Sequence, residues 1–385
     1  MRAHTSIVFT LLASGTAIAG DPAIPTFPAA APSPTVQPEP QPKSGLAGVE
    51  ALIKQAERLK KTLHSELARS MLNPVPGLPR IEPRTLYVND KTGNWYTPQE
   101  RDLLPPAEQT ALTEVVRDEQ FYYSTRFRTP LTYTRPLDLL AAHDAAHDFD
   151  SLAGVRLLDY GYGAIGQLRL MATSGAHCIG IDNDPSLAKL YSQPDDVGEV
   201  LPFIPRFAHR IPMEERPNLP GSIDLRCGRF PVDAGCTPAD ILKVFPKGLH
   251  LFISKDTLTN GCVHPAQPVD KQLLVDLGTT EAAFLTAVHD VLANNGYFLI
   301  YNLSPAPSKP GEPYNLLADG HCPFTKQQLE AAGFEVIVYD ETDDKAAREM
   351  AHALGWDKDG MDVDNDLFAH WTLARRADAS KDKPQ

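Results

Sequence analysis

A glycine-rich turn is the part of this 385-residue chain whose residue types and spacing most directly indicate chemistry; its glycines are Gly161, Gly163 and Gly166. The turn follows a short apolar segment, residues 155–158, and precedes a helical run. Glycines let the backbone approach a ligand closely, and a helix that begins there directs unpaired N–H groups at it. A second apolar strand, residues 177–181, ends on Asp182. This order predicts half of a nucleotide-binding α/β fold.

Two carboxylates beside this turn bear on which nucleotide it suits. Asp159 lies two positions before the first glycine, where a dinucleotide-binding strand usually carries a small or apolar residue. A carboxylate suits a cationic ligand, because it forms charge-assisted hydrogen bonds. S-adenosylmethionine carries an ammonium and a sulfonium group, so Asp159 favours it over a nicotinamide dinucleotide. Asp182 would accept the ribose hydroxyls of either cofactor. A turn that needs glycines and binds nothing is the third alternative.

At these residues the chain resembles the class I S-adenosylmethionine-dependent methyltransferases. Their first motif is an acidic residue followed by G-x-G-x-x-G, and their second strand ends on a ribose-binding acidic residue. The resemblance covers about residues 121–376 and implies S-adenosylmethionine as the cofactor. The cofactor-binding residues that it implies are Asp159, Gly161, Gly163, Gly166, Asp182 and Asn183.

The fold that this resemblance implies is α/β, a Rossmann-like, seven-stranded and mostly parallel sheet with helices on both faces. The sequence supplies apolar strands in a matching order: residues 155–158, 177–181, 223–227, 249–253, 297–303, a strand from 334, and 367–373. The last two fit the antiparallel pair that closes the sheet in this family. A proline-rich insertion, residues 194–220, separates the second and third strands. Family members commonly carry an acidic residue for the adenine amine near the end of the third strand, and here Arg229 stands in that place.

The loop after the fourth predicted strand, residues 254–265, carries the catalytic candidates. Ligands of open parallel sheets bind at the carboxyl ends of the strands, and this loop begins there. An oxygen or nitrogen nucleophile must lose a proton and lie in line with the methyl–sulfur bond. His264 can act as the base, Asp256 can orient His264 or the substrate, and Lys255 suits an anionic substrate group. Each of the three can instead be structural, and Asn302 can position the nucleophile.

The first 120 residues predict an export signal, a linker and an N-terminal extension. Arg2, an apolar stretch and a small-residue cleavage site are typical of a secretory signal peptide, so we expect an exported protein, periplasmic or extracellular. A proline-rich composition follows and predicts a disordered linker. The expected segments are residues 1–19 (signal peptide), 20–43 (linker), 44–120 (amphipathic helix and extended region) and 377–385 (charged tail).

Residues 45–72 have apolar side chains at helical spacing and predict one amphipathic helix closed by Pro74. Its apolar stripe can pack on the main domain, pair with a second copy or lie on a membrane surface. The polar face mixes both charges, which favours packing or self-association over membrane binding.

Charge and composition exclude some partners. The chain has 36 Lys and Arg against 49 Asp and Glu, a formal net charge of −13, so we expect no nucleic-acid partner. No run approaches the ~20 apolar residues of a transmembrane helix. The five cysteines leave at least one unpaired in a monomer. Two spacings that can bind a metal are His143 with His147, and a set of Cys262, His264, His321 and Cys322; neither has the usual ligand pattern, and no metal site is predicted.

The sequence thus predicts an exported methyltransferase that uses S-adenosylmethionine and acts on an unidentified small molecule or protein. Two alternatives belong to other classes. One is an exported, non-catalytic ligand-binding or assembly protein that keeps the fold, and the other is a nicotinamide-dependent oxidoreductase.

Overall fold

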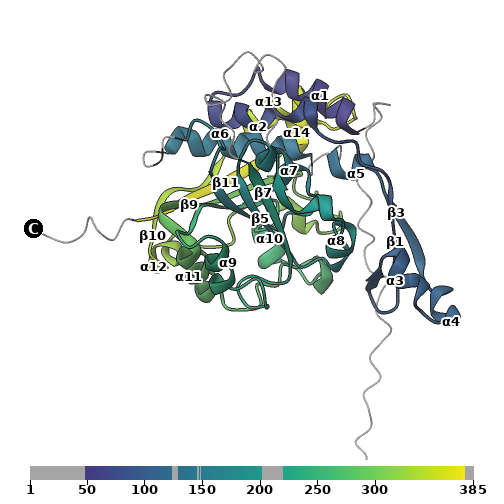
Figure 1. The fold of residues 1–385 in the computed structure, drawn as a ribbon. Helices are drawn as coiled ribbons and strands as arrows, with labels where there is room; N and C mark the ends of the chain where they lie inside the picture. The colour runs from purple at the N-terminus through teal and green to yellow at the C-terminus, as the bar shows by residue number, and fades with distance from the viewer. Residues whose placement is uncertain (1–47, 124–128, 145–146, 148, 202–219, 378–385) are drawn as a thin grey trace, which may run out of the picture. The chain divides into compact units, whose positions relative to one another are not determined.

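The computed structural model describes residues 48–123, 129–144, 147, 149–201 and 220–377. Its main feature is an eight-stranded sheet with the order β10-β11-β9-β8-β4-β5-β7-β6 (Figure 1). The strands are β4 (Arg156–Tyr160), β5 (His177–Asp182), β6 (Gly198–Val200), β7 (Gly221–Cys227), β8 (Leu249–Lys255), β9 (Leu292–Ser304), β10 (Phe334–Thr342) and β11 (Phe368–Arg376).

Five of these strands are parallel and form the centre of the sheet. β4 pairs in parallel with β5 and β8, β5 with β7, and β8 with β9. β11 lies antiparallel between β9 and β10, as expected for the last two strands. The predicted α/β architecture is confirmed. The count is eight rather than seven because β6, within the predicted insertion, pairs antiparallel with β7.

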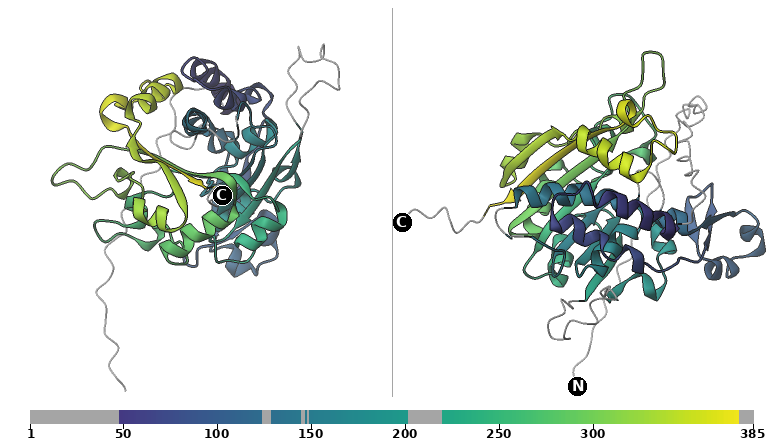
Figure 2. Two further views of the ribbon diagram at one scale, coloured as in Figure 1. Left: turned by 90° about the vertical axis from the view of Figure 1, so that its left-hand side faces the viewer. Right: turned by 90° about the horizontal axis from the view of Figure 1, so that it is seen from above.

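Helices cover both faces of the sheet, as Figure 2 shows for its two sides. One face packs into a cluster of buried side chains that includes residues of α1 (Gly48–Leu59), α2 (Glu66–Leu72), α6 (Thr134–His143), α7 (Gly166–Thr173), α8 (Pro185–Leu190) and α13 (Asp344–Leu354). The other face packs into an aromatic-rich cluster with α9 (Pro238–Val244), α11 (Glu281–Val291) and α12 (Lys326–Ala331). The shorter helices are α5 (Glu119–Tyr123), α10 (Asn260–Val263) and α14 (Val363–Asp366).

A second, three-stranded antiparallel sheet comes from the predicted extended region. Its order is β2-β1-β3, with β1 (Arg84–Asn89), β2 (Asn94–Tyr96) and β3 (Thr113–Arg117); α3 (Pro98–Asp102) and α4 (Pro106–Gln109) connect β2 to β3. Arg84 forms an ion pair of 2.6 Å with the buried Asp196, which precedes β6. Lys189 of α8 pairs with Glu100 of α3 at 2.5 Å. These pairs attach the small sheet to the strand and helix that follow β5.

The amphipathic segment forms two helices rather than one. α1 ends at Leu59, and Ser65 begins α2 by accepting a hydrogen bond from Ala68 N at 3.2 Å. The apolar stripe is buried against the rest of the domain, so packing on the main domain is confirmed; its fully buried members include Leu52, Leu59 and Leu72. The side chains of the stripe are covered within one chain, and self-association through residues 45–72 stays a prediction.

Some predictions fall outside the described residues. The predicted signal peptide and linker, residues 1–43, and the tail from residue 378 lie there. Among the helices of the described residues, none is both long and apolar enough to cross a membrane.

The buried stripe predicts that α1 contributes directly to domain stability. Leu52 is fully buried, so Leu52→Ala should lower the free energy of unfolding by about 2–5 kcal/mol, from lost burial and the cavity that remains. Lys54 lies on the exposed side of the same helix, and Lys54→Ala should change stability by no more than about 0.5 kcal/mol. Urea unfolding followed by circular dichroism measures both, and equal effects would contradict the packing of α1.

Candidate active site

The carboxyl ends of the parallel strands meet at one edge of the sheet, where they surround a cavity of about 110 Å³. Its wall combines residues far apart in the sequence, among them Gly161, Asp182, Asn183, Arg229, Thr257 and Asp276. The structure therefore brings together the first glycine of the turn, the predicted cofactor-binding residues Asp182 and Asn183, and the segment after β8, at the place expected for a ligand of an open parallel sheet.

The three glycines of the turn meet two different requirements. Gly161 has a φ of 76°, and a Cβ there would lie 2.1 Å from Thr257 Oγ1, so the turn packs directly on the segment after β8. Gly163 has a φ of 57° and no heavy atom within 4 Å of its Cβ position. A Cβ on Gly166 would lie 2.6 Å from Tyr122 O. Two glycines thus allow close packing, and Gly163 leaves its backbone open to a ligand.

Asp182 is held in a fixed orientation at the end of β5. Its Oδ2 accepts a hydrogen bond from Gly163 N at 3.0 Å, and its Oδ1 accepts one from Asp184 N at 2.9 Å. The carboxylate is half-buried, and Asn183 beside it is exposed. A carboxylate tied to the open glycine and facing the cavity is suited to accept the two hydroxyls of a ribose.

Asp159 lies beneath the turn and is fully buried. Tyr133 Oη donates to both carboxylate oxygens at 3.0 and 2.9 Å, and Gln167 Nε2 donates to Oδ2 at 3.1 Å. Burial raises the pKa of Asp159 to about 7, against the lowering effect of these two donors. Its oxygens already have partners, so Asp159 would act on an ammonium group through Tyr133 and Gln167 rather than by direct contact.

Lys255 and Asp256 form an ion pair at the end of β8. The Lys255 side chain is 3% exposed and its ammonium lies 5.6 Å from the ring centre of Tyr133. Asp256 has a φ of 61°; its Oδ2 pairs with Lys255 and its Oδ1 accepts from Leu303 N at 2.7 Å. The side chains of Lys255 and Asp256, two of the predicted catalytic residues, are thus paired with other groups of the protein. Neither residue lines the cavity described above.

His264 lies apart from the cavity with Asp182. It follows α10, and its Nε2 lies 3.1 Å from Pro323 O and 3.2 Å from Glu281 Oε1. Asn302 is also internal: its amide nitrogen donates to Leu258 O and Gly320 O, and its oxygen accepts from Asp256 N. The structure brings Lys255, Asp256 and Asn302 together but does not bring His264 to them.

Arg229 lines the cavity and forms ion pairs with two carboxylates. Its guanidinium lies 3.0 Å from Asp233 and 3.0 Å from Asp276, and these carboxylates hold the pKa of the arginine above its usual value. Asp276 belongs to residues 274–276, which line the cavity. Ligand sites usually measure roughly 300–1,000 Å³, so this cavity is smaller than a whole nucleoside needs.

The sequence did not identify Gln167 or Asp276 as residues of this site. Gln167 directly follows the last glycine and so lies in the first turn of α7, which is a signal that could have suggested contact with the preceding strand. Asp276 reaches the cavity from a loop without regular pattern, and no local signal indicates it.

The structure gives no support to the two possible metal sites named above, His143 with His147 and the set of Cys262, His264, His321 and Cys322. Within the described ranges, no group of three or more His, Cys, Asp or Glu side chains is arranged to hold a metal ion. All five cysteines are free thiols, and Cys227 is the exposed one.

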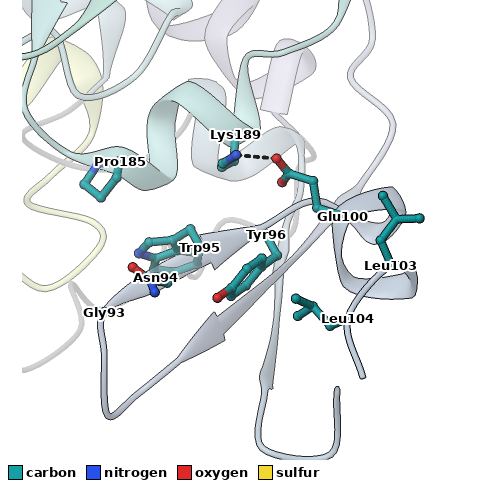
Figure 3. Close-up of a pocket in the computed structure, with 9 residues that line it drawn as sticks. All are labelled: Gly93, Asn94, Trp95, Tyr96, Glu100, Leu103, Leu104, Pro185 and Lys189. Carbon is teal, nitrogen blue, oxygen red and sulfur yellow. Dashed lines mark hydrogen bonds and ion pairs between the residues drawn. The ribbon is translucent and has the colours of Figure 1, made fainter. Parts of the chain in front are cut away.

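A second cavity, of about 490 Å³, lies between the small sheet and α8 (Figure 3). Trp95, Tyr96 and Leu104 contribute apolar surface to it, and the ion pair of Lys189 with Glu100 borders it. None of the residues predicted for cofactor or catalysis lines this cavity, so it is separate from the candidate active site.

Comparison with known proteins gives similarities at the level of structure. The sequence matches no family model and no curated protein. The [4+2]-cyclase SpnF is 18% identical, with 66% of this chain and 86% of that chain covered and a TM-score of 0.33. An S-adenosylmethionine-dependent methyltransferase from Mesorhizobium loti is 14% identical, with 58% and 92% covered and a TM-score of 0.32.

A third similar structure is Haemonchus contortus phospholethanolamine N-methyltransferase 2 in complex with phosphomonomethylethanolamine and S-adenosylhomocysteine. It is 14% identical, with 67% of this chain and 56% of that chain covered and a TM-score of 0.34. Identities and TM-scores this low carry no conclusion about activity, and the fold rests on the strand order described above.

The raised pKa of Asp159 predicts a pH-dependent stability. Between the ordinary value near 3.9 and about 7, the folded protein holds a proton that the unfolded chain releases, so the free energy of unfolding falls as the pH rises. Relative to Asp159→Asn, the wild type should lose about 2–3 kcal/mol between pH 5 and pH 8. Urea unfolding of both proteins at the two pH values measures the difference between their free energies of unfolding. If that difference is the same at pH 5 and at pH 8, the pKa of Asp159 is not raised.

Proposed function

We propose that this chain is an S-adenosylmethionine-dependent methyltransferase that acts on a small-molecule or protein acceptor. The observation that carries the proposal is the bond between Asp182 and Gly163 N. It places an oriented carboxylate and an open glycine backbone together at the carboxyl edge of the sheet. Ribose hydroxyls can donate to the carboxylate while the remainder of the nucleoside lies along the glycine turn.

The surroundings of the cavity fit a cationic cofactor. Asp182 lies in the wall, and Asp159 lies beneath the turn with a pKa that allows it to carry charge above neutral pH. S-adenosylmethionine, when bound, supplies an activated methyl group. The protein then has to hold the acceptor in line, exclude water and accept a proton from an oxygen or nitrogen nucleophile.

A non-catalytic protein with the same fold is the second candidate. Two observations favour a non-catalytic protein, because both oppose entry of a whole nucleoside: the small volume of the cavity and the ion pair between Arg229 and Asp276. Titration with S-adenosylhomocysteine tests the step that a methyltransferase requires: a protein that binds no cofactor is not a methyltransferase, whereas a protein that binds it has still to be tested for methyl transfer.

Asp182 provides the direct test of cofactor binding. Asp182→Ala removes hydrogen bonds to a charged acceptor, worth about 1.5–3 kcal/mol, and should weaken binding of S-adenosylhomocysteine by about 10- to 150-fold. Asp182→Asn keeps one acceptor for Gly163 N and should lose most of the same affinity. Isothermal titration calorimetry measures both variants against the wild type.

The control for this test is Glu199→Ala, which removes an exposed carboxylate from β6. It should bind S-adenosylhomocysteine with wild-type affinity. Circular dichroism melts check that each variant is folded. Wild-type affinity in folded Asp182→Asn and Asp182→Ala would overturn the assignment of Asp182, and absence of binding to the wild type would overturn the proposed function.

We also propose that the protein is exported, from the charged, apolar and small-residue segments of residues 1–19. Cells that express the full chain should contain a mature form that begins near Gly20 in the exported fraction. Cell fractionation followed by N-terminal sequencing measures this, and a full-length chain retained in the cytoplasm would contradict it.

A further inference from the structure

Both ends of α8 are hydrogen-bonded to residues at the cofactor cavity, the cavity of about 110 Å³ described above. Before the helix begins, Asp184 N donates at 2.9 Å to Oδ1 of Asp182, which lines this cavity. After the helix ends, the hydroxyl of Tyr191 accepts a hydrogen bond from Ile165 N at 3.1 Å. Ile165 belongs to the glycine turn, residues 161–166. The position of α8 therefore bears on both the turn and the carboxylate in the cavity wall.

The bond between Ile165 and Tyr191 lies in the interior of the domain, because both residues are buried. Ile165 is the N-cap residue of α7, and its apolar side chain cannot accept a hydrogen bond from the helix. The ring of Tyr191 packs edge-on against Tyr122, with 5.6 Å between the ring centres. Among the described residues, Tyr191 Oη is thus the acceptor that satisfies a buried N–H of the turn.

Arg84 of β1 holds the segment that carries Tyr191. Its guanidinium donates to Leu190 O at 2.6 Å, and to the two carboxylate oxygens of Asp196 at 2.6 and 3.0 Å. Leu190 directly precedes Tyr191, and Asp196 is buried. The planar guanidinium suits such paired bonds, which the ammonium group of a lysine does not reproduce. One side chain of the small sheet therefore holds both ends of residues 190–196.

Asp196 also faces the helix that begins at the glycine turn. Arg169 of α7 lies 3.8 Å from Asp196 Oδ1, so this buried carboxylate lies between the guanidinium groups of Arg84 and Arg169. The small sheet contacts α8 (Figure 1), and Lys189 of α8 pairs with Glu100. The small sheet, α8 and α7 are thus joined by polar contacts.

We propose that the small sheet is part of the cofactor site, with Arg84 and Tyr191 as positioning residues for the glycine turn. This inference rests on the proposed function. Arg84 fixes the segment after α8, the segment fixes the hydroxyl of Tyr191, and the hydroxyl fixes the N–H of Ile165. Gly163, two residues before Ile165, holds the Asp182 carboxylate. The small sheet thereby contributes to the affinity for the cofactor, although none of its residues lines the cavity.

Tyr191→Phe tests the last of these contacts, because it removes the hydroxyl and keeps the ring. Ile165 N then loses its acceptor, and the affinity for S-adenosylhomocysteine should fall by at least about fivefold, the lower end of typical coupling between two sites. Isothermal titration calorimetry measures the affinity at a temperature at which circular dichroism shows that the variant is folded. A purely structural role for Tyr191 would lower the stability of the variant and leave this affinity unchanged.

Arg84→Lys tests the remote end of the same connection. Lysine keeps the positive charge beside Asp196 but cannot reproduce the paired bonds to Leu190 O and the carboxylate. The affinity for S-adenosylhomocysteine should fall, by a smaller factor than in Tyr191→Phe. The backbone amide signal of Ile165 in NMR spectra should also shift, in the absence of any cofactor. Such a shift reports the connection, since the Arg84 side chain bonds the segment after α8 and not the turn itself.

Two control variants separate this role from other effects. Tyr87→Phe removes a hydroxyl of the same small sheet, one that bonds the Glu114 carboxylate at 3.3 Å on the surface. Leu52→Ala lowers the stability of the domain from within α1. Both variants should bind S-adenosylhomocysteine with wild-type affinity.

Wild-type affinity in folded Tyr191→Phe, or an unchanged Ile165 signal in Arg84→Lys, would overturn the inference. If the wild type binds no S-adenosylhomocysteine, the proposed function fails, and the Ile165 signal alone then decides the positioning role. The two failures are therefore distinguishable.

Discussion

The close packing of the glycine turn, residues 161–166, against its neighbours is the constraint on which this structure depends. Gly161 brings the turn against Thr257, and Gly166 brings α7 against Tyr122 O. Without side chains at these two positions, the carboxyl ends of β4 and β8 and the N-terminal part of the domain meet at van der Waals distance. The same turn also holds Asp182 in the wall of the cofactor cavity, because Gly163 N donates to its carboxylate.

The polar groups beneath this contact are arranged in layers. Asp159, Tyr133 and Gln167 form a buried hydrogen-bonded group, and Lys255 lies beside it with its ammonium near the Tyr133 ring. Such a group is expensive to bury unless each member has a partner, and here each has one. The layer nearer to solvent, with Asp182 and Arg229, is the one that a ligand can reach.

Sequence reasoning succeeded where a local pattern reports a local structure. The glycine spacing and the apolar strands predicted the α/β sheet, because both depend on neighbours along the chain. It failed where the outcome depends on contacts between distant residues: β6 is a short edge strand without an apolar pattern, and residues 45–72 break into two helices. The pairing of His321 with Asp340 joins residues 19 positions apart across a register shift, and no spacing rule indicates it.

The attachment of α1 to α13 has a consequence for the order in which the chain can fold. Arg58 Nε donates to Ala353 O and Gln55 Nε2 to Leu354 O, across separations of 295 and 299 residues. Closing loops of this length costs conformational entropy before any contact is gained. α1 is synthesised first among the described helices yet obtains these partners only when nearly the whole chain is available. The domain is therefore completed late, and its N-terminal apolar stripe has to remain soluble, or be protected, until the last helices and strands arrive.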